Sequence, residues 1–213
     1  MFWVNQVYVF DNVISQAKQD EIKERWLTLV PWFYREDVTD SYLEKDQPSR
    51  PGMSHPLYAN KKPRTSRENF ELLNEILSGS FKKLYEKTGI KGNYSLLNSR
   101  SFLQFPLATL NGHEYDNHHV DTYRPHLSVL YYVCDADGET VIFENMLKPK
   151  HGDMLSDEYV KEHKPKLSDL KEKIRVTPKQ GRVVIFDGFH WHTATQPKNG
   201  IRCVINTNIE QQS

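Results

Sequence analysis

Two side chains spaced for metal binding lie in the middle of the chain, at His119 and Asp121. Side chains two residues apart on an extended strand point to the same side, so this imidazole and this carboxylate can converge on one point. A second imidazole arriving from another strand would complete a set of two histidines and one carboxylate on one face of a metal. That set leaves positions open and is typical of non-haem Fe(II) that reacts with oxygen.

The sequence offers two sources for the second imidazole. An apolar strand-like run is followed by His190 and His192, and the residues alone leave both open as the ligand. One of the two is expected to be a loop or supporting group. On the first segment the choice is clearer, because His118 has an apolar i+2 neighbour whereas His119 has an aspartate. With nine histidines in the chain, a chance His-X-Asp in a solvated polar turn is the ordinary alternative.

A basic residue inside an apolar strand strengthens the metal hypothesis. Arg202 lies in the run IRCVIN, ten positions beyond His192. A guanidinium buried without a partner is costly, so this residue predicts an anion close by. Because its planar fork matches a carboxylate, a dicarboxylate ligand would satisfy it.

The elements that must position these residues change character along the chain. Periodic apolar residues predict a helix over 14–29, ended by Pro31, and a second helix that begins at a Thr65–Glu68 capping box and stops at Gly89. From about residue 94, short runs rich in Val, Ile, Tyr and Phe indicate strands. These are expected near 94–105, 117–121, 126–134, 139–144, 173–176, 181–187 and 201–209.

Two segments interrupt this order. Residues 35–64 are polar and proline-rich and predict a long irregular stretch, and 146–172 form a charged insert with a short helix over 157–163. With residues 122–124, they are expected to form walls around the metal. The order of elements predicts one domain over 1–213, with two helices and then a β-rich body closed into a barrel or sandwich.

Composition narrows the classes of partner. Lys plus Arg and Asp plus Glu both total 28, so no net field favours nucleic acid or an anionic membrane. The first ten residues, MFWVNQVYVF, lack a basic flank and predict a strand instead of a signal peptide. Cys134 and Cys203 lie in apolar runs and are expected as buried free thiols in a reducing compartment. We therefore expect a soluble cytoplasmic protein.

From about residue 94 to the end, the chain resembles the Fe(II)/2-oxoglutarate-dependent dioxygenases, in particular the prolyl 4-hydroxylase-like branch. The matching blocks are HHVD, LSVLYYVCDADGETVIFE and GRVVIFDGFHWHTATQPKNGIRCVINTN. The resemblance implies a double-stranded β-helix, or jelly roll, over 94–213. It leaves 1–93 as helical support with a proline-rich loop.

The resemblance also implies a ligand set. His119, Asp121 and His192 would bind the iron. His192 is preferred over His190 because the family follows its distal histidine with a small run, a proline and then the basic residue, as TATQP does here.

Three further residues would face the cosubstrate. Arg202 would pair with the distal carboxylate of 2-oxoglutarate, and the Tyr132 hydroxyl would reach the same carboxylate. Asn206 should share the inward face of the strand with Arg202 and is a further candidate contact. The family often places a tyrosine three residues before the first ligand, whereas Tyr115 lies four before it. Tyr115 is therefore only a candidate for the site rim.

The implied reaction hydroxylates an unactivated C–H while 2-oxoglutarate and O2 yield succinate and CO2. The implied cofactors are Fe(II), 2-oxoglutarate and O2, with ascorbate as a candidate addition. A peptidyl proline is the leading substrate, with another protein side chain or a small molecule as the alternative. A zinc hydrolase with the same ligands and a non-catalytic jelly-roll binding module are the rival functions. Nucleic-acid demethylation is disfavoured by the neutral charge, and the oligomeric state is left open.

Overall fold

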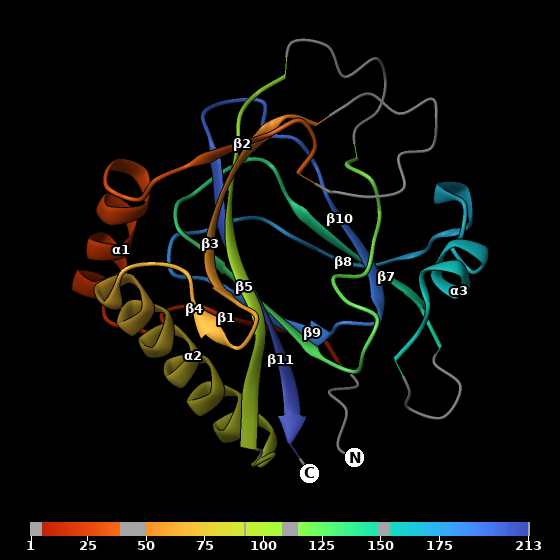
Figure 1. The fold of residues 1–213 in the computed structure, drawn as a ribbon, viewed down its shortest axis with the longest axis horizontal. Coiled ribbons are helices and arrows are strands. Elements are labelled where there is room, and N and C mark those ends of the chain that lie inside the picture. Colours follow the sequence, from red (N-terminus) through yellow and green to blue (C-terminus); the bar gives the residue numbers. More distant parts are fainter. Residues whose placement is uncertain (1–5, 39–49, 92, 108–114, 149–153, 213) are drawn as a thin grey trace.

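A computed structural model describes residues 6–38, 50–91, 93–107, 115–148 and 154–212 (Figure 1). Its helices are α1 (Gln16–Thr28), α2 (Arg67–Thr88) and α3 (Asp157–Glu162). Its strands are β1 (Tyr8–Phe10), β2 (Phe33–Arg35), β3 (Gly52–Ala59), β4 (Lys62–Pro63), β5 (Asn93–Gln104), β6 (Leu127–Tyr132), β7 (Thr140–Met146), β8 (Glu172–Val176), β9 (Val183–Asp187), β10 (His190–Ala194) and β11 (Arg202–Gln212).

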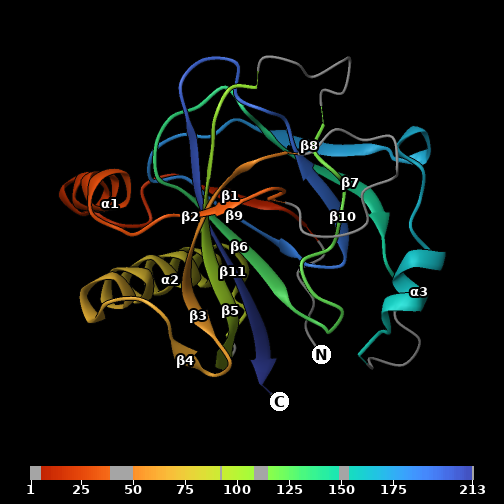
Figure 2. The same cartoon turned by 45° about the horizontal axis from the view of Figure 1, so that its top comes forward.

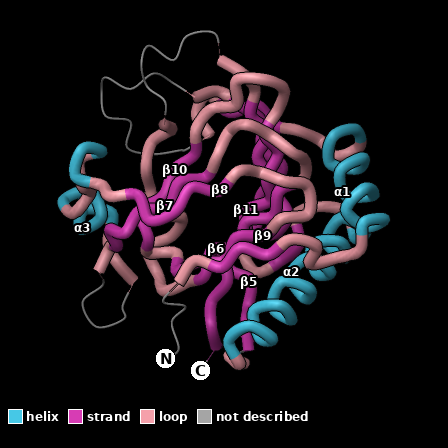
Figure 3. Tube along the Cα trace, turned by 180° about the vertical axis from the view of Figure 1, so that it is seen from behind, coloured by secondary structure: helices cyan, strands magenta, loops and turns pink. Residues whose placement is uncertain are grey.

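The strands form two antiparallel sheets. The large sheet has the order β1-β9-β6-β11-β5-β3-β2 with β4 paired to β3, and the small sheet has the order β10-β7-β8. Side chains from both sheets share one apolar cluster between them, made of Leu130, Tyr132, Ile142, Val176, Val184, Phe186 and Val204. Seen from behind, the small sheet lies on the side away from α1 and α2 (Figure 3). This two-sheet arrangement confirms the predicted jelly roll.

Helices α1 and α2 cover the other face of the large sheet (Figure 2). Because side chains alternate along a strand, β6 sends Val129 and Tyr131 toward the helices while Leu130 and Tyr132 face the small sheet. The helices contribute buried residues, including Ile22, Trp26, Leu73 and Ile76, and these belong to one apolar cluster with Val129 and Tyr131. The expected helical support is therefore present on one side.

Helix α2 matches its prediction except at its first residue. It ends at Gly89, whose φ of 71° is the left-handed conformation that glycine adopts readily. Its cap is Ser66, whose Oγ accepts from the Asn69 backbone N–H at 3.3 Å, so the predicted Thr65–Glu68 capping box is wrong by one residue. Thr65 instead accepts from the Asn69 side chain and lies 2.8 Å from His55 Nε2.

The prediction of an irregular stretch over 35–64 is wrong for residues 52–63, which form β3 and β4. Proline cannot donate to a strand ladder and is tolerated mainly at edges and bulges. Pro56 lies where the register between β3 and β5 shifts, which is such a bulge. Residues 39–49 of this segment lie outside the described residues.

Two other expectations change near the predicted metal ligands. The strand predicted over 117–121 is reduced to one isolated bridge, His119 with His192, and a second isolated bridge joins Tyr115 to Thr195 just before it. A strand that the sequence did not predict, β10, carries the second imidazole. The helix in the insert is confirmed as α3, although residues 149–153 lie outside the described residues.

The termini and cysteines agree with the sequence where they are described. Strand β1 occupies part of the expected amino-terminal strand, while residues 1–5 are not among those described. Cys134 and Cys203 are buried and free. No helix in the described ranges is long and apolar enough to cross a membrane.

Candidate metal centre

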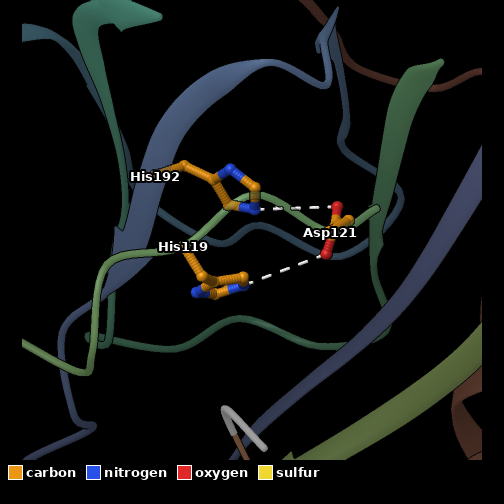
Figure 4. A group of neighbouring side chains, drawn as sticks. All are labelled: His119, Asp121 and His192. Atoms are coloured by element: carbon orange, nitrogen blue, oxygen red, sulfur yellow. Dashed lines mark ion pairs between the residues drawn. The ribbon is translucent and has the colours of Figure 1, made fainter. Parts of the chain in front are cut away.

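His119, Asp121 and His192 converge on one point (Figure 4). Each offers one ligand atom, and the three atoms lie within 4.8 Å of one another. Nε2 of His192 is 3.6 Å from Asp121 Oδ2, and Nε2 of His119 is 3.9 Å from Asp121 Oδ1. The three residues that the resemblance implied as ligands are thus brought together.

The backbone fixes both imidazoles in the same way. The N–H of His119 donates to the His192 carbonyl at 2.9 Å, and the N–H of His192 donates back at 3.0 Å. Nδ1 of His119 lies 2.9 Å from the Asn117 carbonyl, and Nδ1 of His192 lies 2.9 Å from the His190 carbonyl. Because a carbonyl only accepts, each Nδ1 carries a proton and donates it. Each Nε2, the atom that would bind a metal, therefore faces the carboxylate.

Two side chains hold the carboxylate between the imidazoles. Ser128 Oγ donates to Asp121 Oδ2, and Asn206 Nδ2 donates to Asp121 Oδ1, both at 2.8 Å. Burial acts to raise the pKa of Asp121, but the charges of His192 and His119 and the hydrogen bond from His192 hold it well below its usual range. Asp121 is therefore an anion in this site.

The two imidazoles differ in how readily they take up a proton. Burial, with the charge of His192, lowers the pKa of His119 to about 4. Burial also acts to lower the pKa of His192, but Asp121 outweighs it and raises that pKa. A divalent cation between these groups would displace the proton on His192. The donor set therefore fits a metal that takes nitrogen and carboxylate ligands.

His190, the competing histidine, lies outside this cluster. Its Nδ1 is 2.7 Å from the Phe143 carbonyl, and its Nε2 is 3.4 Å from Lys173 Nζ. The register of β10 on β7 shifts between His190 and His192. Because a bulge breaks the alternation of side chains, two residues spaced by two need not share a face here. His190 is therefore a buried part of the small sheet.

A cavity extends from His119, Asp121 and His192 to Arg202. Nε of Arg202 donates to the Gly138 carbonyl at 2.9 Å, and its two Nη atoms donate to Gln104 Oε1 at 2.7 Å and to Thr140 Oγ1 at 2.8 Å. The residue is only 4% exposed. Within the described part of the chain, no carboxylate lies within ion-pair distance of it. Its positive charge is thus available to an anionic ligand in the cavity.

The other residues predicted at the site, Tyr132, Asn206 and Tyr115, differ in whether they line the cavity. Tyr132 is fully buried and donates its hydroxyl to Thr140 Oγ1 at 2.7 Å, and it is Thr140 that lines the cavity. Asn206 lines the cavity but directs its amide to Asp121. The hydroxyl of Tyr115 donates to Glu172 at 2.8 Å on the small sheet and does not line the cavity. Direct contacts of Tyr132 and Asn206 with a cosubstrate stay predictions.

The cavity also has a polar support that sequence reasoning missed. Gln104 donates to Asp116 Oδ2 at 2.8 Å and accepts from Arg202, so it joins the two charges. Asp116 is buried and pairs with Arg50 Nε at 3.2 Å. No local pattern singles out Gln104, because residues 98–101 are all polar and polar and apolar residues do not alternate along this segment. Arg50 and Asp116 carry no local signal either.

The segments expected to form walls around the metal, 35–64, 122–124 and 146–172, contribute few of the described residues that line the cavity. Val38 lines the cavity from the 35–64 segment. Neither 122–124 nor the described part of 146–172 supplies a lining residue. The β5–β11 pair contributes six lining residues: Arg100, Phe102, Gln104, Arg202, Val204 and Asn206.

Comparison with known proteins gives matches in structure only. No protein-family model and no curated protein matches the sequence. Three similar structures cover most of each chain. A viral collagen prolyl hydroxylase from Paramecium bursaria Chlorella virus-1, in complex with 2-oxoglutarate, has 14% identity and a TM-score of 0.54 over 97% of this chain and 96% of its own. A prolyl hydroxylase from Trichoplax adhaerens, bound to a hypoxia-inducible-factor peptide, has 12% identity and a TM-score of 0.56 over 97% and 84%.

The third is SnoN, a non-haem α-ketoglutarate-dependent epimerase from nogalamycin biosynthesis, with 9% identity and a TM-score of 0.61 over 95% of this chain and 77% of its own. At these identities the likeness concerns the fold. The chain therefore has the jelly-roll fold of the 2-oxoglutarate-dependent non-haem iron oxygenases.

Proposed function

We propose that this protein is an Fe(II)- and 2-oxoglutarate-dependent dioxygenase that hydroxylates an unactivated C–H, with a peptidyl proline as the leading substrate. One observation carries the proposal. Two imidazoles and one carboxylate meet at a cavity whose far end holds a buried arginine with no carboxylate partner among the described residues. A metal ion would bind the imidazoles and the carboxylate at one end, and an oxoacid would bind the arginine at the other.

The chain's own residues would divide the work. His119, Asp121 and His192 would hold the iron and leave its other positions facing the cavity. Arg202 and Thr140 would bind the distal carboxylate of the oxoacid, with Gln104 keeping the guanidinium in place. When bound, the iron and 2-oxoglutarate would supply, with O2, the hydroxylation of the substrate and the release of succinate and CO2, one oxygen atom of O2 entering the substrate and the other succinate.

The remaining lining protects and directs the reaction. The side chains of Phe102, Leu130 and Val204 line the cavity and limit the entry of water. Ser128 and Asn206 keep the carboxylate of the metal site oriented. Such support is commonly needed for metal affinity.

Arg202 separates this proposal from a zinc hydrolase. A hydrolase with two histidines and an aspartate needs a metal-bound water but no buried cation at the far end of its cavity. Placing Arg202 there is costly unless an anion binds. The dioxygenase proposal gives that residue a role.

The substrate proposal has weaker support than the chemistry. Two of the similar structures are named prolyl hydroxylases, and one of these holds a peptide. The epimerase SnoN shows that the same fold also serves other chemistry. Another protein side chain and a small molecule therefore stay alternatives to peptidyl proline.

Turnover of the purified protein tests the proposal. Protein supplied with Fe(II), 2-oxoglutarate, ascorbate and air is assayed for succinate against proline-containing peptides, and each peptide is weighed for an added oxygen atom. We expect succinate and oxygenated peptide together, and neither when 2-oxoglutarate is omitted or when His119→Ala is used. Hydrolysis by the metal-loaded protein without any dependence on 2-oxoglutarate would instead favour the hydrolase.

A further inference from the structure

The cavity holds a second arginine at its other end. Strands β5 and β11 pair so that Gln104 is opposite Arg202 and Arg100 is opposite Asn206. All four side chains line the cavity. Since a strand rises about 3.3 Å per residue, the step of four residues separates the two cross-strand pairs by about 13 Å. The two guanidinium groups therefore come from opposite ends of the cavity floor.

Arg100 lies on the metal side of this floor. Its cross-strand neighbour Asn206 donates to Asp121, and directly opposed side chains on one face of a sheet have Cβ atoms about 5 Å apart. The Cζ atom of Arg100 lies 4.9 Å from the centroid of the Phe102 ring, which also lines the cavity. This cation–π contact helps to keep the guanidinium in the cavity wall.

This end of the cavity is also the more open one. Arg202 is 4% exposed, whereas Arg100 is half-buried. Among the three metal ligands, the side chain of His119 is 27% exposed, against 5% for His192 and 1% for Asp121. A substrate would therefore approach the metal from the side of His119 and Arg100, while the oxoacid occupies the closed end.

We propose that the substrate carries a carboxylate close to the oxidised C–H and that Arg100 binds this carboxylate. The inference rests on the proposed function, because it assigns the closed end to 2-oxoglutarate. The planar guanidinium can donate two parallel hydrogen bonds to a carboxylate, which sets orientation as well as affinity. The carboxylate could belong to a free amino acid or to an acidic side chain beside the target residue of a peptide.

Matched pairs that differ by one charge test this assignment. The first pair is L-proline and L-prolinamide, and the second is an end-blocked Glu-Pro-Gly peptide and its Gln-Pro-Gly counterpart. Binding is measured by calorimetry without oxygen on protein loaded with Fe(II) and 2-oxoglutarate, and turnover is then measured in air. We expect one acid to bind at least about tenfold more tightly than its neutral partner. The pair that shows the difference identifies the source of the carboxylate.

The variants assign the effect to one side chain. Arg100→Gln should abolish the preference for the acid, and Arg100→Lys should retain part of it because the charge stays. Arg67→Gln, which removes an arginine whose side chain is 87% exposed on α2, should leave the preference unchanged. Equal binding of acid and neutral partners, failure of every acid to bind, or a preference that survives Arg100→Gln would overturn the inference. The proposed function fails separately, if the wild-type protein loaded with Fe(II) does not bind 2-oxoglutarate.

Discussion

The two faces of the β5–β11 pair differ in what their polar groups do. On the outer face, Ser99 and Thr207 hydrogen-bond to each other at 2.8 Å, and Ser101 accepts from Trp26 Nε1 of helix α1 at 2.6 Å. These groups satisfy one another beneath the helices. On the inner face, Arg100, Gln104, Arg202 and Asn206 line the cavity beside the proposed metal ligands.

The inner face also keeps unused hydrogen-bonding capacity. Asn206 Oδ1 is buried without a hydrogen-bond partner among the described residues, and no carboxylate there lies within ion-pair distance of Arg202. Buried groups of this kind are costly unless a ligand completes them. One pair of strands thus separates stabilising side chains from reactive ones by the simple alternation of its residues. Substitutions on the two faces should therefore have different effects.

The largest effect is expected at the metal itself. Asp121→Ala removes the anionic ligand, so we expect turnover to fall to background and Fe(II) to be lost on dialysis. The melting temperature, followed by circular dichroism, serves as the control for folding. A folded and active Asp121→Ala protein would contradict the ligand set.

A second inner-face change should act on the cosubstrate. Arg202→Ala removes charge-assisted hydrogen bonds of about 1.5–3 kcal/mol, so the KM for 2-oxoglutarate should rise by about 10- to 100-fold. Fe(II) binding should persist. The matched control is Arg182→Ala. Arg182 does not line the cavity, and its Nε donates to Asp11 Oδ1 at 2.7 Å. An unchanged KM in Arg202→Ala would remove the proposed anion site.

A third inner-face change tests the place of Asn206. Because its amide holds Asp121, Asn206→Ala should weaken Fe(II) affinity by about 10- to 100-fold with little change in the KM for 2-oxoglutarate. Asn98→Ala, which removes an amide that contacts Asn208 instead, is the control. The reverse pattern, with normal Fe(II) affinity and a higher KM, would support the direct cosubstrate contact that the sequence predicted.

The smallest functional effect is expected on the outer face. Trp26→Phe leaves the buried hydroxyl of Ser101 without its donor, which should lower the free energy of unfolding by about 1–3 kcal/mol. Urea unfolding measures this change. The KM for 2-oxoglutarate should stay at the wild-type value, and a marked rise would show that the two faces are not independent.

Local patterns predicted the reactive residues better than the elements that carry them. The spacing of His119 and Asp121 and the position of Arg202 in an apolar run are visible in the sequence because they are local features. Arg202 does lie on a strand, whereas His119 is held by an isolated bridge and Asp121 lies outside any strand. The choice of His192 over His190 came from the family resemblance. In the structure it depends on a bulge, which strand pairing decides and a single strand does not encode.

The supporting residues were harder to predict because their partners are distant in the chain. Arg50 meets Asp116, and Asn206 reaches Asp121, only after the sheet has formed. The segment over 52–63 was predicted as irregular from its prolines, although the bulge at Pro56 lets β3 join the sheet. In each case tertiary pairing outweighed the local composition.

The central claim is that His192, together with His119 and Asp121, binds one metal ion. Equilibrium dialysis against Fe(II) without oxygen tests it on the wild-type protein and on two matched variants, His190→Ala and His192→Ala. We predict one Fe(II) per chain for the wild-type protein and for His190→Ala, and none for His192→Ala. Full binding by His192→Ala, or loss of binding only in His190→Ala, would contradict the proposed metal centre.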